Sequence, residues 1–135
     1  MTVHHLSHAG MLQPAPYHHV AVATGTKHVH VAGQVAYQAD GSPIPADLAG
    51  QVAQALRNTA TGLAGAGATF ADVTRLTFYV TGWQAEMIED LMSGVAEVAD
   101  EINLQLPMPP ASLIGVEALF DPDILVEIEA TATLD

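Results

Sequence analysis

The stretch ILVEIEATAT, residues 124–133, predicts the strand on which the fold of this chain depends. Alternate residues along it are apolar and suit contact with a helix layer: Ile124, Val126, Ile128, Ala130 and Ala132. The residues between them are mostly polar: Leu125, Glu127, Glu129, Thr131 and Thr133. A strand with two such different faces packs one face on a hydrophobic core and presents the other to solvent or to a second subunit.

Two amphipathic helices upstream would supply the apolar layer that this strand needs. The first pattern begins at Asp47, and its apolar residues recur at helical spacing: Leu48, Val52, Leu56, Ala60 and Leu63. The glycines of GAGAT, residues 65–69, are expected to end it, because glycine adopts the left-handed conformation without steric cost. The second helix is predicted over about residues 84–103, with one apolar and one acidic side.

Four further strands are predicted. Residues 17–25 and 27–37 alternate in polarity around the turn sequence TGTK and predict a hairpin. Residues 72–80 form a strand with Arg75, Thr77 and Tyr79 on its polar face, and a short strand covers about residues 111–118. The order ββαβαββ predicts an α+β fold in which two helices pack on one face of a mixed sheet. Residues 1–135 make one domain, and residues 1–16 are expected to be an irregular arm.

The charge balance limits the kinds of molecule that this protein is expected to bind. Lys27, Arg57 and Arg75 are the only cations against 15 acidic residues, and the net charge is −12. Nucleic acids and anionic membranes are bound through lysine and arginine, so neither is an expected partner. No apolar run is long enough to span a membrane, there is no basic and apolar leader, and there is no cysteine, so a cytoplasmic protein is expected. Half of the residues are hydrophobic, which favours self-association.

The histidines could suggest a metal site, and the two glutamates of the last strand could suggest an acid/base pair. His28 and His30 project from one strand face, and His18 and His19 lie on the predicted hairpin partner, but no third ligand is near, so no metal site is expected. Glu127 and Glu129 share a strand face at about 6.5–7 Å, yet the chain lacks the aromatic residues of a sugar site. Glu127 remains either a base that positions water or a solvated or interface carboxylate.

Several segments together resemble one protein family. They are VHVAGQVAY (29–37), the region from ADLAGQVAQ to LTFYV (46–80), PPASLIGVEAL (109–119) and ILVEIEATA (124–132). With the spacing of Gln51, Leu56 and Asn58 in the first helix, they resemble the RidA/YjgF/YER057c/UK114 family from about Tyr17 to the end of the chain. The resemblance implies a chorismate-mutase-like fold and a homotrimer whose sheets form a barrel, with small-molecule clefts between subunits. Its best-understood members hydrolyse 2-imino acids to 2-oxo acids and ammonia without a metal or organic cofactor.

The resemblance also assigns site residues. Glu127 takes the position of a glutamate that orients water, Gly33 that of the glycine in the family's S-G-Q segment, and Tyr17 that of the tyrosine in its P-Y segment. The backbone near Ile114 is expected to help position the substrate. No cofactor is implied, and the expected partner is a small metabolite.

Three positions depart from the family pattern. Ser112 stands where the deaminating members have an arginine that grips the substrate carboxylate, Ala32 replaces a hydroxyl residue, and Asp90 replaces an asparagine. Loss of the guanidinium removes a charge-assisted bidentate contact, so efficient 2-imino acid deamination is not expected. Two hypotheses remain: action on an imine, enamine or related small carbonyl compound, or a non-catalytic trimer that binds a metabolite or has a regulatory role. Whether Arg75 reaches the cleft decides if any cation can replace the missing one. Endoribonuclease activity, an older description within the family, is disfavoured by the net charge.

Overall fold

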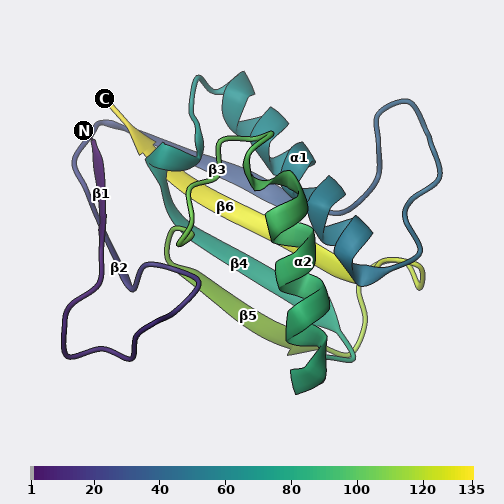
Figure 1. The fold of residues 1–135 in the computed structure, drawn as a ribbon. Helices are drawn as coiled ribbons and strands as arrows, with labels where there is room; N and C mark the ends of the chain where they lie inside the picture. Colours follow the sequence, from purple (N-terminus) through teal and green to yellow (C-terminus); the bar gives the residue numbers. More distant parts are fainter. Residues whose placement is uncertain (1) are drawn as a thin grey trace.

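A computed structural model describes residues 2–135 and shows a helix layer packed on a sheet (Figure 1). The strands are β1 (Val3–Leu6), β2 (Val20–Ala23), β3 (Lys27–Gln34), β4 (Val73–Thr81), β5 (Ala111–Val116) and β6 (Val126–Leu134). The helices are α1 (Leu48–Gly65) and α2 (Ile88–Ala99), with short 3-10 turns at Phe70–Asp72 and Ala85–Met87. None of the helices in this described part has the length and apolarity to cross a membrane.

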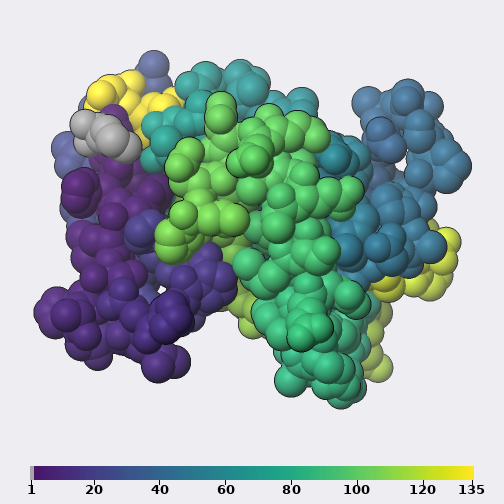
Figure 2. Space-filling model, in the orientation of Figure 1, coloured from purple at the N-terminus to yellow at the C-terminus, as the bar shows by residue number. Residues whose placement is uncertain are grey.

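The main sheet has four strands in the order β3-β6-β4-β5. The last strand, β6, runs antiparallel to both of its neighbours, whereas β4 and β5 are parallel and are connected through α2. Both helices cover the same face of this sheet, and Figure 2 shows the molecule from that side. The predicted α+β class, with two helices on one face of a mixed sheet, is confirmed.

The core lies between the helices and this face, and the alternation of the sequence produces it. The apolar set predicted for the last strand is buried, from Ile124 just before β6 through Val126, Ile128, Ala130 and Ala132 within it. On β4 the buried residues Leu76, Phe78 and Val80 also point to the helices, which contribute Leu56, Leu63, Val95 and Val98. Because alternate residues of β4 and β6 pack against the helices, the intervening polar residues of these two strands must lie on the opposite face.

Two residues of α1 that belong to the family resemblance, Gln51 and Asn58, have a structural role. The buried Gln51 amide donates to the carbonyl oxygens of Pro45 and Asp123 and accepts from the Leu125 N–H, each at 2.9 Å. Asn58 donates to the carbonyl oxygens of Val35 and Tyr37. These amides therefore tie α1 to the segments that follow β3 and precede β6, and they satisfy backbone groups that regular structure leaves unpaired.

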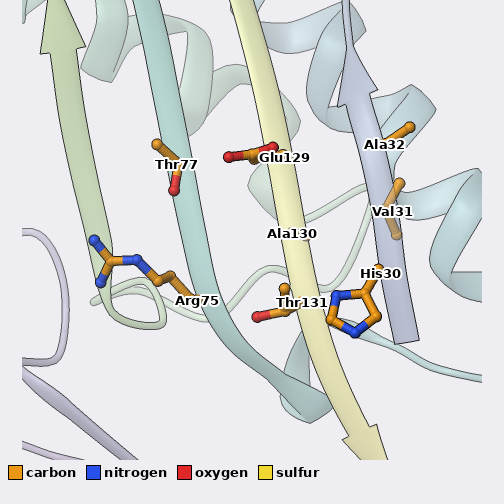
Figure 3. A pocket seen from close by; sticks show the side chains of 8 residues that line it. All are labelled: His30, Val31, Ala32, Arg75, Thr77, Glu129, Ala130 and Thr131. Carbon is orange, nitrogen blue, oxygen red and sulfur yellow. The ribbon is translucent and has the colours of Figure 1, made fainter. Parts of the chain in front are cut away.

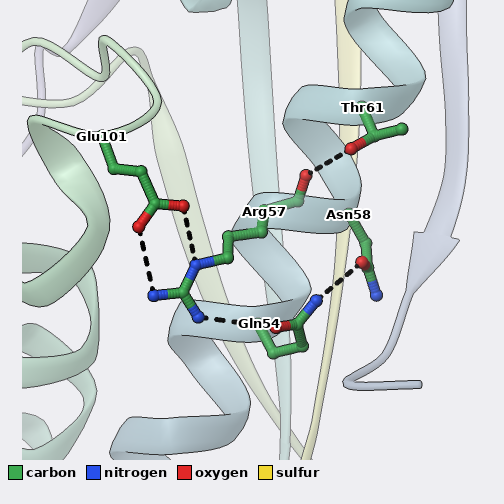
Figure 4. Close-up of polar contacts among 5 residues, drawn as sticks. All are labelled: Gln54, Arg57, Asn58, Thr61 and Glu101. Atoms are coloured by element: carbon green, nitrogen blue, oxygen red, sulfur yellow. Dashed lines mark hydrogen bonds and ion pairs between the residues drawn. The ribbon is translucent and has the colours of Figure 1, made fainter. Parts of the chain in front are cut away.

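Arg57 connects α1 to the segment that follows α2. Its guanidinium makes a two-point contact with Glu101, beyond the end of α2, and a longer one with Gln54 (Figure 4). Both charged side chains are partly exposed, so the pair adds little stability. It does, however, commit one of the chain's three cations to the helix layer.

The N-terminal segment differs from prediction in two respects. Residues 20–23 do not form a hairpin with the next strand: β2 pairs with β1, and β3 pairs with β6. Nor is the arm irregular throughout, because residues 3–6 form β1 and the His5 ring is hydrogen bonded to the Val73 carbonyl oxygen at 2.6 Å. Alternation indicates which face a residue occupies but not which strand lies beside it, so both errors concern pairing. The predicted order ββαβαββ holds from β2 onward, after this additional strand.

The contact between the two helices gives a first prediction. A Cβ added at Gly94 of α2 would lie 2.8 Å from Val52 Cβ and would overlap the Ala49 carbonyl oxygen of α1. Gly94→Ala is therefore expected to lower the free energy of unfolding by about 1–3 kcal/mol, measured by urea denaturation. Gly65→Ala is the matched control: nothing lies within 4 Å of its added Cβ. It should be neutral or stabilising by up to about 1 kcal/mol. Equal stability of the two variants would contradict the proposed close helix contact.

Candidate functional site

The face of the main sheet opposite the helices carries a mixed set of charged and polar side chains. We call it the open face. By register and alternation it holds His28, His30, Ala32, Arg75, Thr77, Tyr79, Ser112, Ile114, Glu127, Glu129, Thr131 and Thr133. Four strands therefore place a cation, two carboxylates, several hydroxyls and two imidazoles on one surface. Thr133 alone of its strand's polar set is buried, because the chain at Gly25 lies against it.

A hollow of about 450 Å³ lies on this face. Its lining residues come from β3, β4 and β6: His30, Val31, Ala32, Arg75, Thr77, Glu129, Ala130 and Thr131. Figure 3 shows the Glu129 carboxylate pointing from β6 toward Thr77, and the Arg75 side chain extending from β4 toward β5. The hollow thus contains one cationic and one anionic side chain among neutral groups.

Arg75 reaches Ser112. Thr77 of β4 is the register partner of Ser112 on β5, and the Arg75 guanidinium donates from Nη2 to the Ser112 hydroxyl. A cation therefore lies beside the serine, although the sequence around residue 112 contains none. Among residues 2–135 the only ion pair joins Arg57 to Glu101, so Arg75 has no carboxylate partner there.

Glu129 is held by Tyr79, which lies diagonally across from it on β4. The Tyr79 hydroxyl donates to Glu129 Oε1. This hydrogen bond, followed by reduced contact with water and by the negative charges of Glu129 and Glu127, raises the pKa of the Tyr79 phenol, while the nearby Arg75 lowers it. The phenol therefore stays protonated at neutral pH and keeps one carboxylate oxygen of Glu129 fixed.

Glu127 meets Gly33. A Cβ added at Gly33 would overlap Glu127 Oε2 and lie 2.6 Å from its Cδ, so the carboxyl group occupies the space that any other residue would fill. The pairing of β3 with β6 shifts its register between Val31 and Gln34, at this glycine. The glutamate and the glycine that the family resemblance assigns are thus in direct proximity.

Ser112 also lies near Tyr17. The two line an apolar crevice of about 80 Å³ together with core residues such as Leu91 and Met108. The position of Tyr17 is set by backbone pairing, in which the Met108 N–H donates to the Pro16 carbonyl oxygen at 2.8 Å and Met108 accepts from His18 at 2.7 Å.

The remaining predicted site residues are dispersed. Ala32 lines the hollow, and Ile114 is 44% exposed in the row of Tyr79 and Glu127. Asp90 is exposed on the first turn of α2, in the helix layer, and lines neither the hollow nor the crevice.

Two of the assigned residues stay apart within one chain. Ser112 and Glu127 are on β5 and β6, with β4 between them, so two strand spacings of about 4.8 Å each separate their strands.

His18 and His19 do not lie beside the strand that carries His28 and His30, although the predicted hairpin would have placed them there. His18 stacks on His5 with ring centroids 5.8 Å apart, and His19 Nδ1 is 2.9 Å from the Ser7 hydroxyl, so neither faces the histidines of β3. The position of His18 and His19 opposite β3 is therefore wrong. No group of three or more histidine, cysteine or acidic side chains that could hold a metal ion occurs within residues 2–135.

Sequence reasoning missed the two pairs that organise the hollow. It placed Arg75, Thr77 and Tyr79 on one polar face, but the partners Ser112 and Glu129 depend on which strands are neighbours. The only available signal was the alternation of three strands, and alternation carries no information on strand order.

Comparisons with known proteins match this chain over nearly its whole length. A sequence model described as Endoribonuclease L-PSP matches residues 10–134, and no curated protein matches. The chain is similar to a solved Rid family protein of unknown function from Yersinia pestis, YyfB, with 34% identity over 99% of this chain and 100% of that one and a TM-score of 0.86. It is 30% identical to Rv2704 of Mycobacterium tuberculosis, a YjgF/YER057c/UK114 family member, covering 98% and 99% of the two chains with a TM-score of 0.62. It is 25% identical to E. coli TdcF, solved with bound serine, covering 91% of each chain with a TM-score of 0.69.

The Tyr79–Glu129 contact gives a second prediction. Because folding raises the pKa of Tyr79, this group stabilises the protein below about pH 10, and the contribution is lost as pH rises through the folded-state pKa. In Glu129→Gln the Tyr79 pKa should fall toward its ordinary value. Ultraviolet absorbance titration of tyrosinate measures the change, with Tyr79→Phe variants of both proteins identifying the signal. An unchanged titration in Glu129→Gln would contradict the contact.

Proposed function

Because the chain belongs to the endoribonuclease L-PSP family, to which the Rid and YjgF proteins also belong, we propose that it acts on an imine, an enamine or a related small carbonyl compound. The reaction takes place in clefts between the subunits of a homotrimer. Hydrolysis of an imine forms a C–O bond from water to the C=N carbon, transfers protons to nitrogen and releases ammonia, leaving a carbonyl product. Such a reaction requires a positioned carboxylate and no redox partner.

The proximity of Glu127 and Gly33 is the observation that carries this proposal. The Glu127 carboxylate lies against the backbone at residue 33, where only a glycine leaves room for it. A carboxylate held in this way can accept a proton from the attacking water and direct its oxygen toward the substrate. Backbone groups around residue 33 and near Ile114 would complete the positioning.

The homotrimer is proposed because one chain offers only part of the cleft. Glu127 and Ser112 lie on β6 and β5, separated by β4, and they do not meet in one copy. The sheet also has two free edges, β3 and β5, and an exposed apolar residue, Ile114, on its open face. Packing of open faces from several copies would bring Glu127 of one subunit near Ser112 of another.

Turnover of 2-imino acids is proposed to be inefficient. The Arg75 guanidinium approaches Ser112 from β4 and uses one donor on the serine hydroxyl, so it does not reproduce an arginine rooted at residue 112 on β5. A carboxylate bound by Arg75 would be held at a different place relative to Glu127. The serine bound to TdcF, a relative, supports a small amino-acid-like compound as the ligand class without fixing the reaction.

A non-catalytic metabolite-binding or regulatory trimer is the second candidate. It is favoured by the two departures at the cleft, Ser112 and Ala32, which remove a guanidinium and a hydroxyl from positions where the resemblance places them. In that case Glu127 would be a ligand-binding or interface carboxylate.

An imine hydrolysis assay tests the proposal. With freshly generated 2-iminobutyrate, the parent protein should be slow, and Ser112→Arg should be faster because it restores a bidentate carboxylate contact. Glu127→Gln should reduce the residual rate by roughly 10²-fold or more, since the proton acceptor is lost. Full activity of the parent would contradict the interpretation of Ser112, and an unchanged rate in Glu127→Gln would contradict its catalytic role.

Gly33→Ala offers an independent test of positioning. The added methyl group must displace the Glu127 carboxyl group, whose flexible end can move with little cost to folding. We expect near-parental thermal stability together with an activity loss that approaches that of Glu127→Gln. Retained activity in Gly33→Ala would show that the position of Glu127 is not important.

Sedimentation velocity on the same proteins tests the homotrimer. A monomer would contradict the proposal of a cleft between subunits.

A further inference from the structure

We propose that two loops at one end of the sheet form a docking site for an arginine-bearing segment of a partner protein. One loop follows β3 and the other precedes β6, and Figure 1 shows both at the same end of the molecule. The side chains that carry the proposal are Tyr37, Phe120, Asp121 and Asp123, and together they are called the loop surface. None of them belongs to the open face, so the inference does not rest on the proposed hydrolysis.

Helix α1 fixes both loops. The buried Gln51 amide donates to the Asp123 carbonyl oxygen at 2.9 Å. Asn58 donates to the Tyr37 carbonyl oxygen at 2.6 Å. Within the second loop, the Asp123 N–H donates to Asp121 Oδ1 at 3.0 Å. The loop surface therefore projects from a backbone that is held in place, and a partner would not have to order it on binding.

Two aromatic rings of the loop surface are exposed. Phe120 is 71% exposed and Tyr37 is 45% exposed, and the rings meet edge to face with their centroids 5.8 Å apart. Neither ring belongs to the hydrophobic core. Aromatic side chains are enriched at the centres of protein interfaces, where they contribute large contact area. The pair is therefore suited to contact with a partner.

Carboxylates lie beside these rings. Asp121 and Asp123 line a hollow of about 530 Å³ together with Tyr37. A guanidinium suits this combination, because it can stack on an aromatic face and donate to a carboxylate at the same time. An ammonium group has no planar face and makes the ion pair only. The chemistry of the loop surface therefore favours arginine over lysine.

Within residues 2–135 no cation of the chain pairs with these two carboxylates, since the only ion pair joins Arg57 to Glu101. Lys27 and Arg75 are aligned with residues 134 and 131 of β6, whereas the second loop leads into its first residue, Val126. Both cations thus lie toward the far end of that strand. A cation from outside would complement the charge of the loop surface.

A partner protein suits this site better than a free cation or a second copy does. Contacts of a cation with exposed rings and exposed carboxylates are each weak, so a free cation would gain little. A peptide adds the contacts of its backbone and of neighbouring side chains. A second copy could offer only Lys27 and Arg75, because its Arg57 is paired, and Arg75 lies on the open face.

Peptides with blocked ends test the docking site. The sequences GRARG, GKAKG and GQAQG carry two arginines, two lysines and no charge. Titration calorimetry at low ionic strength should show saturable binding of the arginine peptide, weaker by about threefold or more for the lysine peptide. The neutral peptide should not bind. Acetylarginine amide represents a free cation and should bind about tenfold more weakly than the arginine peptide, or less.

Variants of the loop surface assign the contacts. Phe120→Ser should weaken binding of the arginine peptide by about threefold or more, because it removes an exposed ring. The double variant Asp121→Asn/Asp123→Asn should weaken it by about threefold or more, because both charges are lost. Asparagine at residue 121 keeps a side-chain oxygen that can accept from the residue 123 N–H, so the loop is expected to keep its shape.

Two matched controls separate these contacts from the general attraction of a negatively charged protein. Leu12→Ser removes an apolar side chain that is 86% exposed on the N-terminal arm. Glu97→Gln/Asp100→Asn removes two exposed carboxylates at the end of α2. Both controls should bind the arginine peptide as the parent does. Circular dichroism checks that all variants are folded.

The outcomes distinguish this site from the proposed reaction. Glu127→Gln should lose hydrolysis and bind the arginine peptide as the parent does. Absence of saturable peptide binding would overturn the inference, and so would equal losses in the control and loop-surface variants. Acetylarginine amide that binds as tightly as the peptide would indicate a site for a small cation instead. Dissociation of the assembled protein by the peptide, seen by sedimentation velocity, would place the loop surface within a subunit interface and also overturn it.

Discussion

Packing of alternate residues of β4 and β6 against the helices sets the orientation of every other side chain on these two central strands. Val126, Ile128 and Ala130 enter the core, so Glu127, Glu129 and Thr131 must point the other way. The same holds for Arg75, Thr77 and Tyr79 on β4. One periodicity therefore builds both the hydrophobic core and the polar open face, and a change of register in either central strand would exchange the two.

Two of the chain's three cations have distinct positions and contacts. Arg57 is committed to Glu101 in the helix layer, whereas Arg75 lies on the open face and contacts only the Ser112 hydroxyl among the contacts described. In a chain with 15 acidic residues and a net charge of −12, a guanidinium without a carboxylate partner among the described residues is unexpected. The contact with Ser112 holds this cation near the position where the family resemblance leads one to expect a guanidinium, but from a different strand.

The residues that identify the family fall into two physical groups. Gln51 and Asn58 satisfy backbone groups of the segments beside α1 and are needed for the fold. Gly33 and Glu127 meet on the open face and concern the site. A resemblance in sequence covers both groups without distinguishing them. For that reason the fold and the family are established here, while the reaction rests on the chemistry of a few side chains.

Local periodicity in the sequence was enough to predict two amphipathic helices, the alternation of β4 and β6, and the α+β class, because it reports which side of an element is buried. The neighbours of each strand became known from the folded chain alone. It paired β3 with β6 instead of β2, formed β1 from the N-terminal arm, brought Arg75 to Ser112 across 37 residues and joined Tyr79 to Glu129 across 50 residues. Strand order follows from how the whole core closes, and residues that are distant in sequence meet only after it has closed, so no local pattern could specify these contacts.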